Sequence, residues 1–180
     1  IEQLGVRNLI VEAREAPDQQ TLQKIRQLSP GLNFKDLRVI QANVEGIAAA
    51  TARKRFTPSK LIPRPQSDPP MVYGVSPAYM SIANLTVVSG RFFDDRETAG
   101  AAPVTVLGEA AAASLFGAED PIGRYVKVNE QWFQVIGVGG PQLTVQADVA
   151  GLPPQDRNNL IYVPLHAAIF RLEDVNSRYR

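Results

Sequence analysis

The sequence predicts a mixed α+β protein made of two small lobes. Short runs of Leu, Ile and Val alternate along the chain with short helical segments, which is the pattern of an α+β fold. Fourteen prolines and thirteen glycines require many turns and exclude an all-helical bundle. With 180 residues, 44% of them hydrophobic, the chain can bury one ordinary core or two small ones.

The composition also narrows the function. A formal net charge of +1 and the hydrophobic content argue against a disordered tail and against a nucleic-acid binder. Cysteine is absent, so disulfides and thiolate chemistry are excluded. The single histidine, His166, argues against a histidine-based metal site. We expect no signal peptide and no transmembrane helix. The nearest candidate for a membrane span is the Ala-rich run 101–118, and Pro103 and Gly108 interrupt it.

The first residues show no leader pattern and begin inside structured sequence, so we expect a piece excised from a longer protein. Residues 9–13 (LIVEA) predict a buried strand. Residues 17–31 predict a polar helix with Asp18 as its N-cap, or else a surface insertion.

Residues 32–46 carry the clearest helix signal. Asn33 is the expected N-cap, and Asp36 at the third helical position favours the positive end of the helix dipole. Gly46 is the expected C′ residue. Apolar residues at spacings of three and four predict one buried stripe, formed by Phe34, Leu37, Ile40 and Val44.

The next segment predicts a long β-hairpin over residues 47–75. Residues 47–61 form the first expected strand, with basic residues on its outer part. Residues 63–70 are too rich in proline for a central strand and predict a loop. Residues 71–75 return as the second strand.

Ser76 is the expected N-cap of a short helix with Pro77 at its first position. Gly117 and the Asp120-Pro121 pair mark the next clear stops. Between and after these residues we expect an extended segment over 86–93, a capped turn over 94–100, a strand over 103–108 and a short helix over 109–117.

Residues 124–138 predict a second hairpin, in which Tyr125 and Lys127 face one way and Val126 and Val128 the other. A strand over 158–165 and a helix over 166–175 complete the expected elements.

Glycines at 137, 139 and 140 suggest a phosphate-binding loop. Such a loop needs a helix that opens directly after the glycines, and here Pro141 and strand-like residues follow. We therefore interpret residues 137–140 as a turn.

Two groups of acidic residues, Asp94, Asp95 and Glu97, and Glu119 with Asp120, could serve as acid–base pairs or hold a hard cation. Both groups lie where caps and turns are expected, and capping is the favoured interpretation.

Ser114 and His166 could be imagined as parts of a catalytic triad. No G-x-S-x-G motif is present, however, and Ser114 falls in the middle of an expected helix. We expect no catalytic, cofactor-binding or metal-binding residue.

Partner contact remains as a role for some side chains. Basic residues along the first hairpin could meet an acidic partner or an anionic lipid surface, or simply form a solvated face. Large apolar residues of the second half belong in a core, although some could face a partner. The candidates for partner contact are Arg53, Arg55, Lys60, Phe92 and Phe93.

Several pieces occur in an order that is similar to a known family. They are Gly74-Val75, Pro77, Tyr79, Gly90-Arg91, Phe93, the strand 104–108, LFG at 115–117, DPIG at 120–123, FQVIGV at 133–138 and YVP at 162–164. In this order they resemble the periplasmic core domain of MacB-type ABC transporter permeases, a class that includes FtsX-like proteins. Individual pieces are weak signals, and their order is the strong one.

The resemblance implies a porter-like α/β lobe with an inserted Sabre-like α+β lobe. On this sequence the porter-like lobe takes 1–62, the Sabre-like lobe 63–165, and a truncated return to the first lobe 166–180. It also implies a non-catalytic domain on the periplasmic side of the inner membrane. The implied partners are its own transmembrane helices, a second permease subunit, a cytoplasmic ATPase, a periplasmic adaptor and an outer-membrane duct.

Two alternatives stay open from the sequence. One is a stand-alone periplasmic module that binds a protein or lipoprotein through the 47–75 hairpin. The other is a small hydrolase that uses the acidic turn residues. The chain also departs from the family pattern, because it stops at Arg180 and carries a longer, more helical link over 17–30.

Overall fold

The structure is a computed structural model that describes residue 11, residues 32–140 and residues 158–173. The chain divides into two compact units, 1–50 and 51–180. The strand predicted over 9–13 and the helix predicted over 17–31 lie outside the described residues, except for Val11.

In the first unit the described helix is α2 (Phe34–Asn43). Its predicted N-cap is confirmed, because the Asn33 side chain accepts from the Lys35 amide at 2.7 Å. Asp36 Oδ2 also accepts from the Asn33 amide at 2.8 Å, and this completes a capping box that was not predicted. Gly46 has a φ of 82°, but the helix cap is Val44, so Gly46 lies one residue beyond the predicted position.

The buried stripe predicted for this helix is wrong for the structure as described. No residue of α2 is buried, and Phe34 is 44% exposed. The helical period was correct, but burial needs a second element to pack against, and α2 is the only helix or strand described in this unit.

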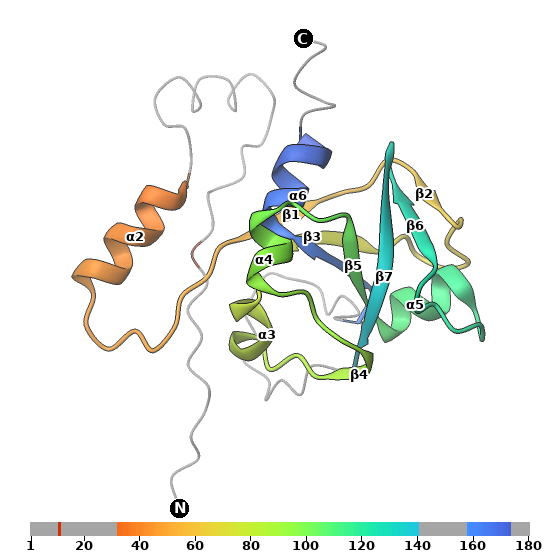
Figure 1. Ribbon diagram of the computed structural model, residues 1–180, viewed down its shortest axis with the longest axis horizontal. Coiled ribbons are helices and arrows are strands. Elements are labelled where there is room, and N and C mark those ends of the chain that lie inside the picture. Colours follow the sequence, from red (N-terminus) through yellow and green to blue (C-terminus); the bar gives the residue numbers. More distant parts are fainter. Residues whose placement is uncertain (1–10, 12–31, 141–157, 174–180) are drawn as a thin grey trace, which may run out of the picture. The chain divides into compact units, whose positions relative to one another are not determined.

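The second unit is built on one sheet of eight strands (Figure 1). Their order is β1-β3-β8-β5-β7-β6-β2, and β4 also pairs with β7. The β3–β8 and β5–β7 pairs are parallel, and the other pairs are antiparallel. The strands are β1 (Arg53–Phe56), β2 (Leu61–Ile62), β3 (Met71–Val75), β4 (Val87–Gly90), β5 (Val104–Gly108), β6 (Tyr125–Val128), β7 (Gln131–Gly139) and β8 (Leu160–Pro164).

Short helices connect these strands. They are α3 (Ala78–Ile82), α4 (Asp95–Ala99), α5 (Glu109–Phe116) and α6 (Leu165–Ala167), which continues into the π-helical segment η1 (Ala168–Glu173). The predicted mixed α+β class is confirmed. The lobe boundaries at residues 62 and 165 stay a prediction.

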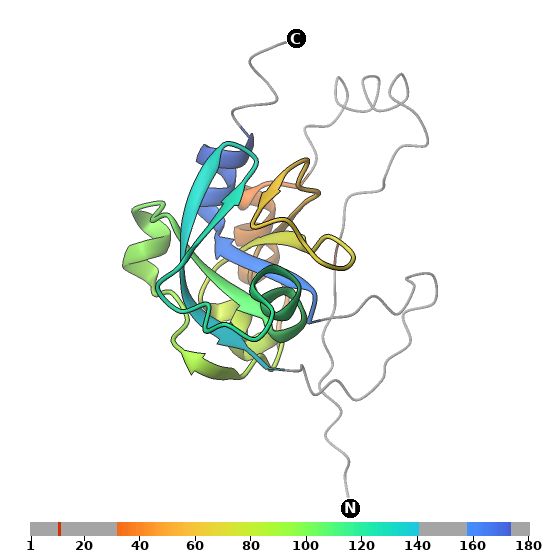
Figure 2. The same ribbon diagram turned by 90° about the vertical axis from the view of Figure 1, so that its right-hand side faces the viewer.

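The sheet is strongly curled. β1 and β2 stand at the two ends of the strand order, yet only residues 57–60 separate them in the chain. In a flat sheet, six strand spacings would hold the end strands about 29 Å apart. The chain from Phe56 to Leu61 can reach at most about 18 Å. The sheet must therefore bend its two end strands toward each other, and the two views show it wrapped around an interior (Figures 1 and 2).

One core fills this interior and takes side chains from every strand of the order. Phe133 and Val126 are fully buried in it, and α5 and the C-terminal helical segment pack against it. The strand residues of this core include Phe56, Leu61, Val72, Leu107, Val126, Phe133, Val135 and Ile161. Each fully buried side chain of this size contributes about 1.5–3 kcal/mol relative to exposure.

A second core covers part of the outer face of the sheet. Tyr162 of β8 lies at its centre, with the Tyr79 ring of α3 at a centroid distance of 5.9 Å. The segment before and after β4 adds Leu85 and Phe93. The central strands β5 and β8 are therefore buried on both faces, which explains the continuous apolar run of β8.

The long strand predicted over 47–61 is wrong in part. Only β1 and β2 are strands there, and the link between them breaks the predicted run. β1 pairs with β3 as the hairpin predicted, but β2 pairs with β6. The amide oxygen of Asn129 accepts from the Ser59 and Lys60 amides at 2.9 and 3.3 Å, and this clamp turns the chain toward β6.

The predicted N-cap role of Ser76 is also wrong. The next helix starts at Ala78 with Pro77 as its cap and no side-chain cap bond. The Ser76 hydroxyl instead forms a hydrogen bond with the Thr51 hydroxyl, which ties the start of the unit to the end of β3.

The turn predicted over 137–140 is wrong as well. Gly137 and Gly139 lie within β7, where they pair with β4 and β5. A Cβ atom at Gly137 would collide with the main-chain carbonyl of Arg91, and one at Gly139 would lie 3.0 Å from Leu85. The glycines are therefore required by close approach between strands, which a sequence pattern cannot separate from a turn.

We predict that Gly137→Ala lowers the stability of the chain by at least about 1–3 kcal/mol, because main-chain atoms of the neighbouring segment must move to admit the methyl group. Urea unfolding followed by circular dichroism measures this. Gln131→Ala in the same strand, whose side chain makes no hydrogen bond with a described residue, is the control and should change stability by less than about 0.5 kcal/mol. Equal midpoints for the two variants would contradict this packing account.

Candidate functional site

The first acidic group forms a closed network at the start of α4. Asp94 is the N-cap, and its carboxylate accepts from the Glu97 amide at 2.8 Å. Glu97 returns the bond by accepting from the Asp94 amide at 3.0 Å. The two terminal nitrogens of the Arg91 guanidinium, Nη1 and Nη2, each donate to one oxygen of the Glu97 carboxylate at 2.8 Å. The predicted capping role of Asp94 is confirmed, and the sequence missed the bidentate arginine.

The electrostatics of this network do not suit proton transfer. The hydrogen bonds from Arg91 are the largest influence on Glu97 and hold the pKa of its carboxyl below the ordinary value, against a smaller effect of burial. A general acid needs a pKa raised toward neutrality. Glu97 is thus held as a carboxylate that joins the end of β4 to α4.

The second acidic group is also engaged in local structure. Asp120 Oδ1 accepts from the Ile122 amide at 3.0 Å, which is the predicted turn. Glu119 forms an ion pair with Arg124, and both side chains are more than half exposed. Among residues 32–140 and 158–173, no group of three or more acidic or histidine side chains is placed to hold a metal ion.

Ser114 and His166 are occupied by different neighbours. The Ser114 hydroxyl is 5% exposed and accepts from the Ser67 hydroxyl at 2.9 Å, which pins the 63–70 loop to α5. His166 lies edge-on to the Phe170 ring on the C-terminal helical segment. The hydroxyl that a catalytic triad would need is therefore a buried structural group.

The basic residues of the first hairpin have different neighbours. Arg53 and Arg55 are two positions apart in β1 and lie on the same face of the strand, and the Arg53 guanidinium lies 4.8 Å from the centre of the Tyr73 ring. Lys54 lies near Phe56, 5.5 Å from its ring centre. Lys60 is exposed in the link that precedes β2. Partner contact through Arg53, Arg55 and Lys60 stays a prediction.

The two phenylalanines have separate environments. Phe93 is 2% exposed and belongs to the outer core. It offers no surface to a partner, so the predicted partner contact of Phe93 is wrong. Phe92 is half-buried against the same core, with its ring 4.2 Å from the Phe93 ring. Its partner contact stays a prediction.

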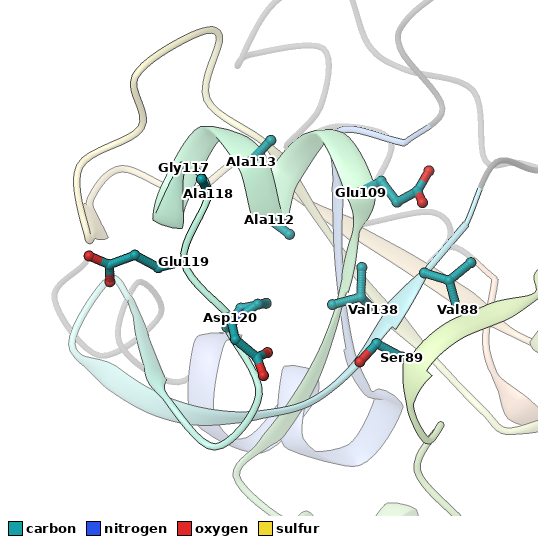
Figure 3. A pocket seen from close by; sticks show the side chains of 11 residues that line it. Val88, Ser89, Glu109, Ala112, Ala113, Gly117, Ala118, Glu119, Asp120 and Val138 are labelled. Atoms are coloured by element: carbon teal, nitrogen blue, oxygen red, sulfur yellow. The ribbon is translucent and has the colours of Figure 1, made fainter.

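An open hollow of about 380 Å³ lies between α5, the 117–121 loop and the strands β4 and β7 (Figure 3). Its walls carry small residues of α5 and the following loop, and three carboxylates lie on its rim. Those carboxylates belong to Glu109, Glu119 and Asp120. The acidic residues of the sequence analysis thus border a surface that no motif identified.

Exposed aromatic residues mark a second surface. Tyr125 is 55% exposed and Trp132 is 50% exposed, on the outer face of the β6–β7 hairpin. The hairpin and its alternation were predicted, and they place Tyr125 outside correctly.

No helix in the described part of the chain is long and apolar enough to cross a bilayer.

The mixed α+β fold of the second unit agrees with the fold class that the resemblance in the sequence implies. The sequence model of the protein family described as the MacB-like periplasmic core domain matches residues 4–179 of this chain. The chain belongs to this family. The MacB-like periplasmic core domain is a non-catalytic domain of an ABC transporter permease.

Curated relatives of this MacB-like domain are export proteins. It is 31% identical over 159 residues to the macrolide export ATP-binding/permease protein MacB of Rhodospirillum rubrum, covering 82% of this chain and 23% of that protein. The Bdellovibrio bacteriovorus MacB is 40% identical over 101 residues, covering 56% and 14%. The pyoverdine export ATP-binding/permease protein PvdT of Pseudomonas aeruginosa is 35% identical over 101 residues, covering 56% and 14%. The chain thus spans less than a quarter of these relatives.

Two solved structures share the fold. The periplasmic region of MacB from Actinobacillus actinomycetemcomitans has a TM-score of 0.57 at 20% identity, covering 79% of this chain and 65% of that one. The extracellular domain of the noncanonical ABC-type transporter YknZ from Gram-positive bacteria has a TM-score of 0.56 at 22% identity, covering 79% and 67%. The curled sheet is therefore the fold of periplasmic and extracellular transporter domains.

We predict that Glu97→Gln lowers the stability of the MacB-like domain by about 1 kcal/mol at pH 7, because it removes a charge-assisted capping bond. A carboxyl whose folded pKa is depressed adds stability above its unfolded value and loses it as the pH falls through the folded value. The difference between variant and wild type should therefore shrink below about pH 4.

Urea unfolding at several pH values measures this difference. Glu119→Gln is the matched control, since its ion pair with Arg124 is exposed on both sides and has no capping role. The control should change stability by less than about 0.5 kcal/mol. A Glu97→Gln effect that is independent of pH would contradict the electrostatic account.

Proposed function

We propose that this chain is the extracytoplasmic domain of an inner-membrane ABC transporter permease, and that it couples ATP-driven motion of transmembrane helices to export or to partner proteins. The observation that carries the proposal is the family match over residues 4–179. The names of the relatives, which are ATP-binding/permease proteins for export, support it.

A domain that transmits motion has to move as a stiff body, and the packing of the second unit supports this role. The pairing order joins the strands from β1 to β8 into one sheet with buried cores on both sides of its centre. Close-packed protein interiors have low compressibility and transmit strain. Displacement of one edge of the sheet would therefore carry the rest with it.

The C-terminal helical segment is tightly joined to the sheet. Ala167 and Ala168 are fully buried, and a Cβ atom added at Gly74 of β3 would lie 2.5 Å from the Ala168 Cβ atom. Arg171 Nε donates to the Ala101 carbonyl at 3.0 Å. In the proposed mechanism, this segment transfers movement between the sheet and the rest of the parent protein.

The partners follow from the same proposal. They are the chain's own transmembrane helices, a second permease subunit and a cytoplasmic ATPase, with a periplasmic adaptor and an outer-membrane duct in the MacB branch. The division into a porter-like and a Sabre-like lobe belongs to this proposal too.

The coupling can be tested without knowledge of the substrate. Ala99 is an exposed residue of α4, and this chain has no cysteine, so Ala99→Cys accepts the only spin label in this domain. We predict that, in the parent permease assembled with its ATPase, the distance between labels on two subunits shifts by several ångströms when ATP replaces ADP. Double electron–electron resonance measures this distance.

Two controls accompany the measurement. A second label at Tyr125 of β6 in the same subunit should keep its distance to Ala99, because α4 and β6 belong to one stiff body. An ATPase variant that cannot hydrolyse or bind ATP should abolish the shift between subunits. Identical distances with ATP and ADP in the active transporter would refute the coupling.

A further inference from the structure

Two residues of the strand β4, Val88 and Ser89, line the hollow. The strand pairs with β7 on one side, and no strand within the described ranges pairs with its other side. Val88 is 55% exposed, and Ser89 and Gly90 are also exposed. Edge strands in natural proteins are usually blunted by charge or proline. The sequence Val-Val-Ser-Gly of β4 carries neither.

The floor of the hollow is made of small and apolar residues. Ala112, Ala113 and Ala118 face it together with Gly117 and Val138 (Figure 3). Side chains this small leave room for a foreign backbone to approach closely. The shape fits an extended segment with short apolar side chains.

The rim of the hollow is negative. Glu109 and Glu119 lie at opposite ends of the hollow with Asp120 between them, and none of the lining residues is basic (Figure 3). Arg124 neutralises Glu119, and Asp120 uses Oδ1 for its turn. Glu109 makes no ion pair or hydrogen bond with any described residue. Such a rim attracts lysine and arginine and repels anionic lipids and nucleic acids.

We propose that this hollow is a docking groove for an extended segment of a partner protein that carries short apolar side chains between lysine or arginine residues. The segment adds as a strand to the free edge of β4, its apolar side chains enter the hollow, and its basic side chains meet Glu109 and Asp120. Strand addition supplies affinity through main-chain hydrogen bonds, and the alternate side chains supply specificity.

This inference rests on the proposed partner-binding role of the domain and names one surface for it. It does not depend on how ATP-driven motion reaches the domain. A failure to bind would leave the spin-label experiment unaffected, and a failure of coupling would leave the groove untouched.

The test uses the whole chain labelled with ¹⁵N and a synthetic peptide, acetyl-Gly-Lys-Ala-Val-Ala-Lys-Gly-amide. The expected result is saturable chemical-shift change in the amides of β4, α5 and the 117–121 loop. The same peptide with glutamate in place of lysine should bind at least about tenfold more weakly, since two attractions become repulsions.

Two variants of the chain locate the site. Ala113→Trp fills the groove at an exposed position and should abolish the shifts. Glu109→Gln together with Asp120→Asn should weaken binding about fivefold. Glu130→Gln, on the distant β6–β7 turn and paired with Lys127, is the matched control and should leave binding unchanged. Native amide spectra of every variant exclude misfolding as the cause.

Several outcomes would overturn the inference. They are no saturable binding, shifts that map outside the groove, equal binding of the glutamate peptide, or wild-type binding by Ala113→Trp. A concentration-dependent dimer in sedimentation, dissociated by Ala113→Trp, would assign the groove to a second copy of this chain and would also overturn it.

Discussion

The four-residue link between β1 and β2 is the constraint on which the second unit depends. It joins the two ends of the strand order, and its reach is too short for a flat sheet. The sheet therefore closes on itself around Phe133 and its neighbours, and the end strands add Phe56 and Leu61 to the same core. The Asn129 side chain accepts hydrogen bonds from the Ser59 and Lys60 amides. These bonds hold the link beside β6, so that β2 can pair there and close the sheet.

Because the sheet curls, its inner and outer faces have different surroundings, and these surroundings set which residues a partner can reach. The inner face is filled, and the central part of the outer face is covered by α3 and the segment around β4. What stays accessible is the end of the outer face with Tyr125 and Trp132, and the hollow beside β4. A rigid interior with accessible edges fits a domain that moves as one body and meets other proteins.

The charged residues that first suggest chemistry are parts of this architecture. Arg91 follows β4 directly, and its two bonds to Glu97 connect that strand to the start of α4. Because an arginine holds the pKa of the carboxyl down, Glu97 stays ionised and structural. Of the three acidic residues that border the hollow, Glu119 is paired with Arg124, and Glu109 and Asp120 keep carboxylate oxygens available.

The sequence by itself determined the features that depend on a few neighbouring residues. These include the N-cap at Asn33, the cap at the start of residues 94–100, the stop of α5 at Gly117 and the alternation of the second hairpin, because each depends on residues only a few positions apart. The ordered pieces of the second half also identified the family. Only the tertiary structure decided the burial of Phe93, the place of Gly137 within β7 and the break in the first long strand. Each of these depends on which distant segments lie side by side, and a local pattern of residues carries no record of that.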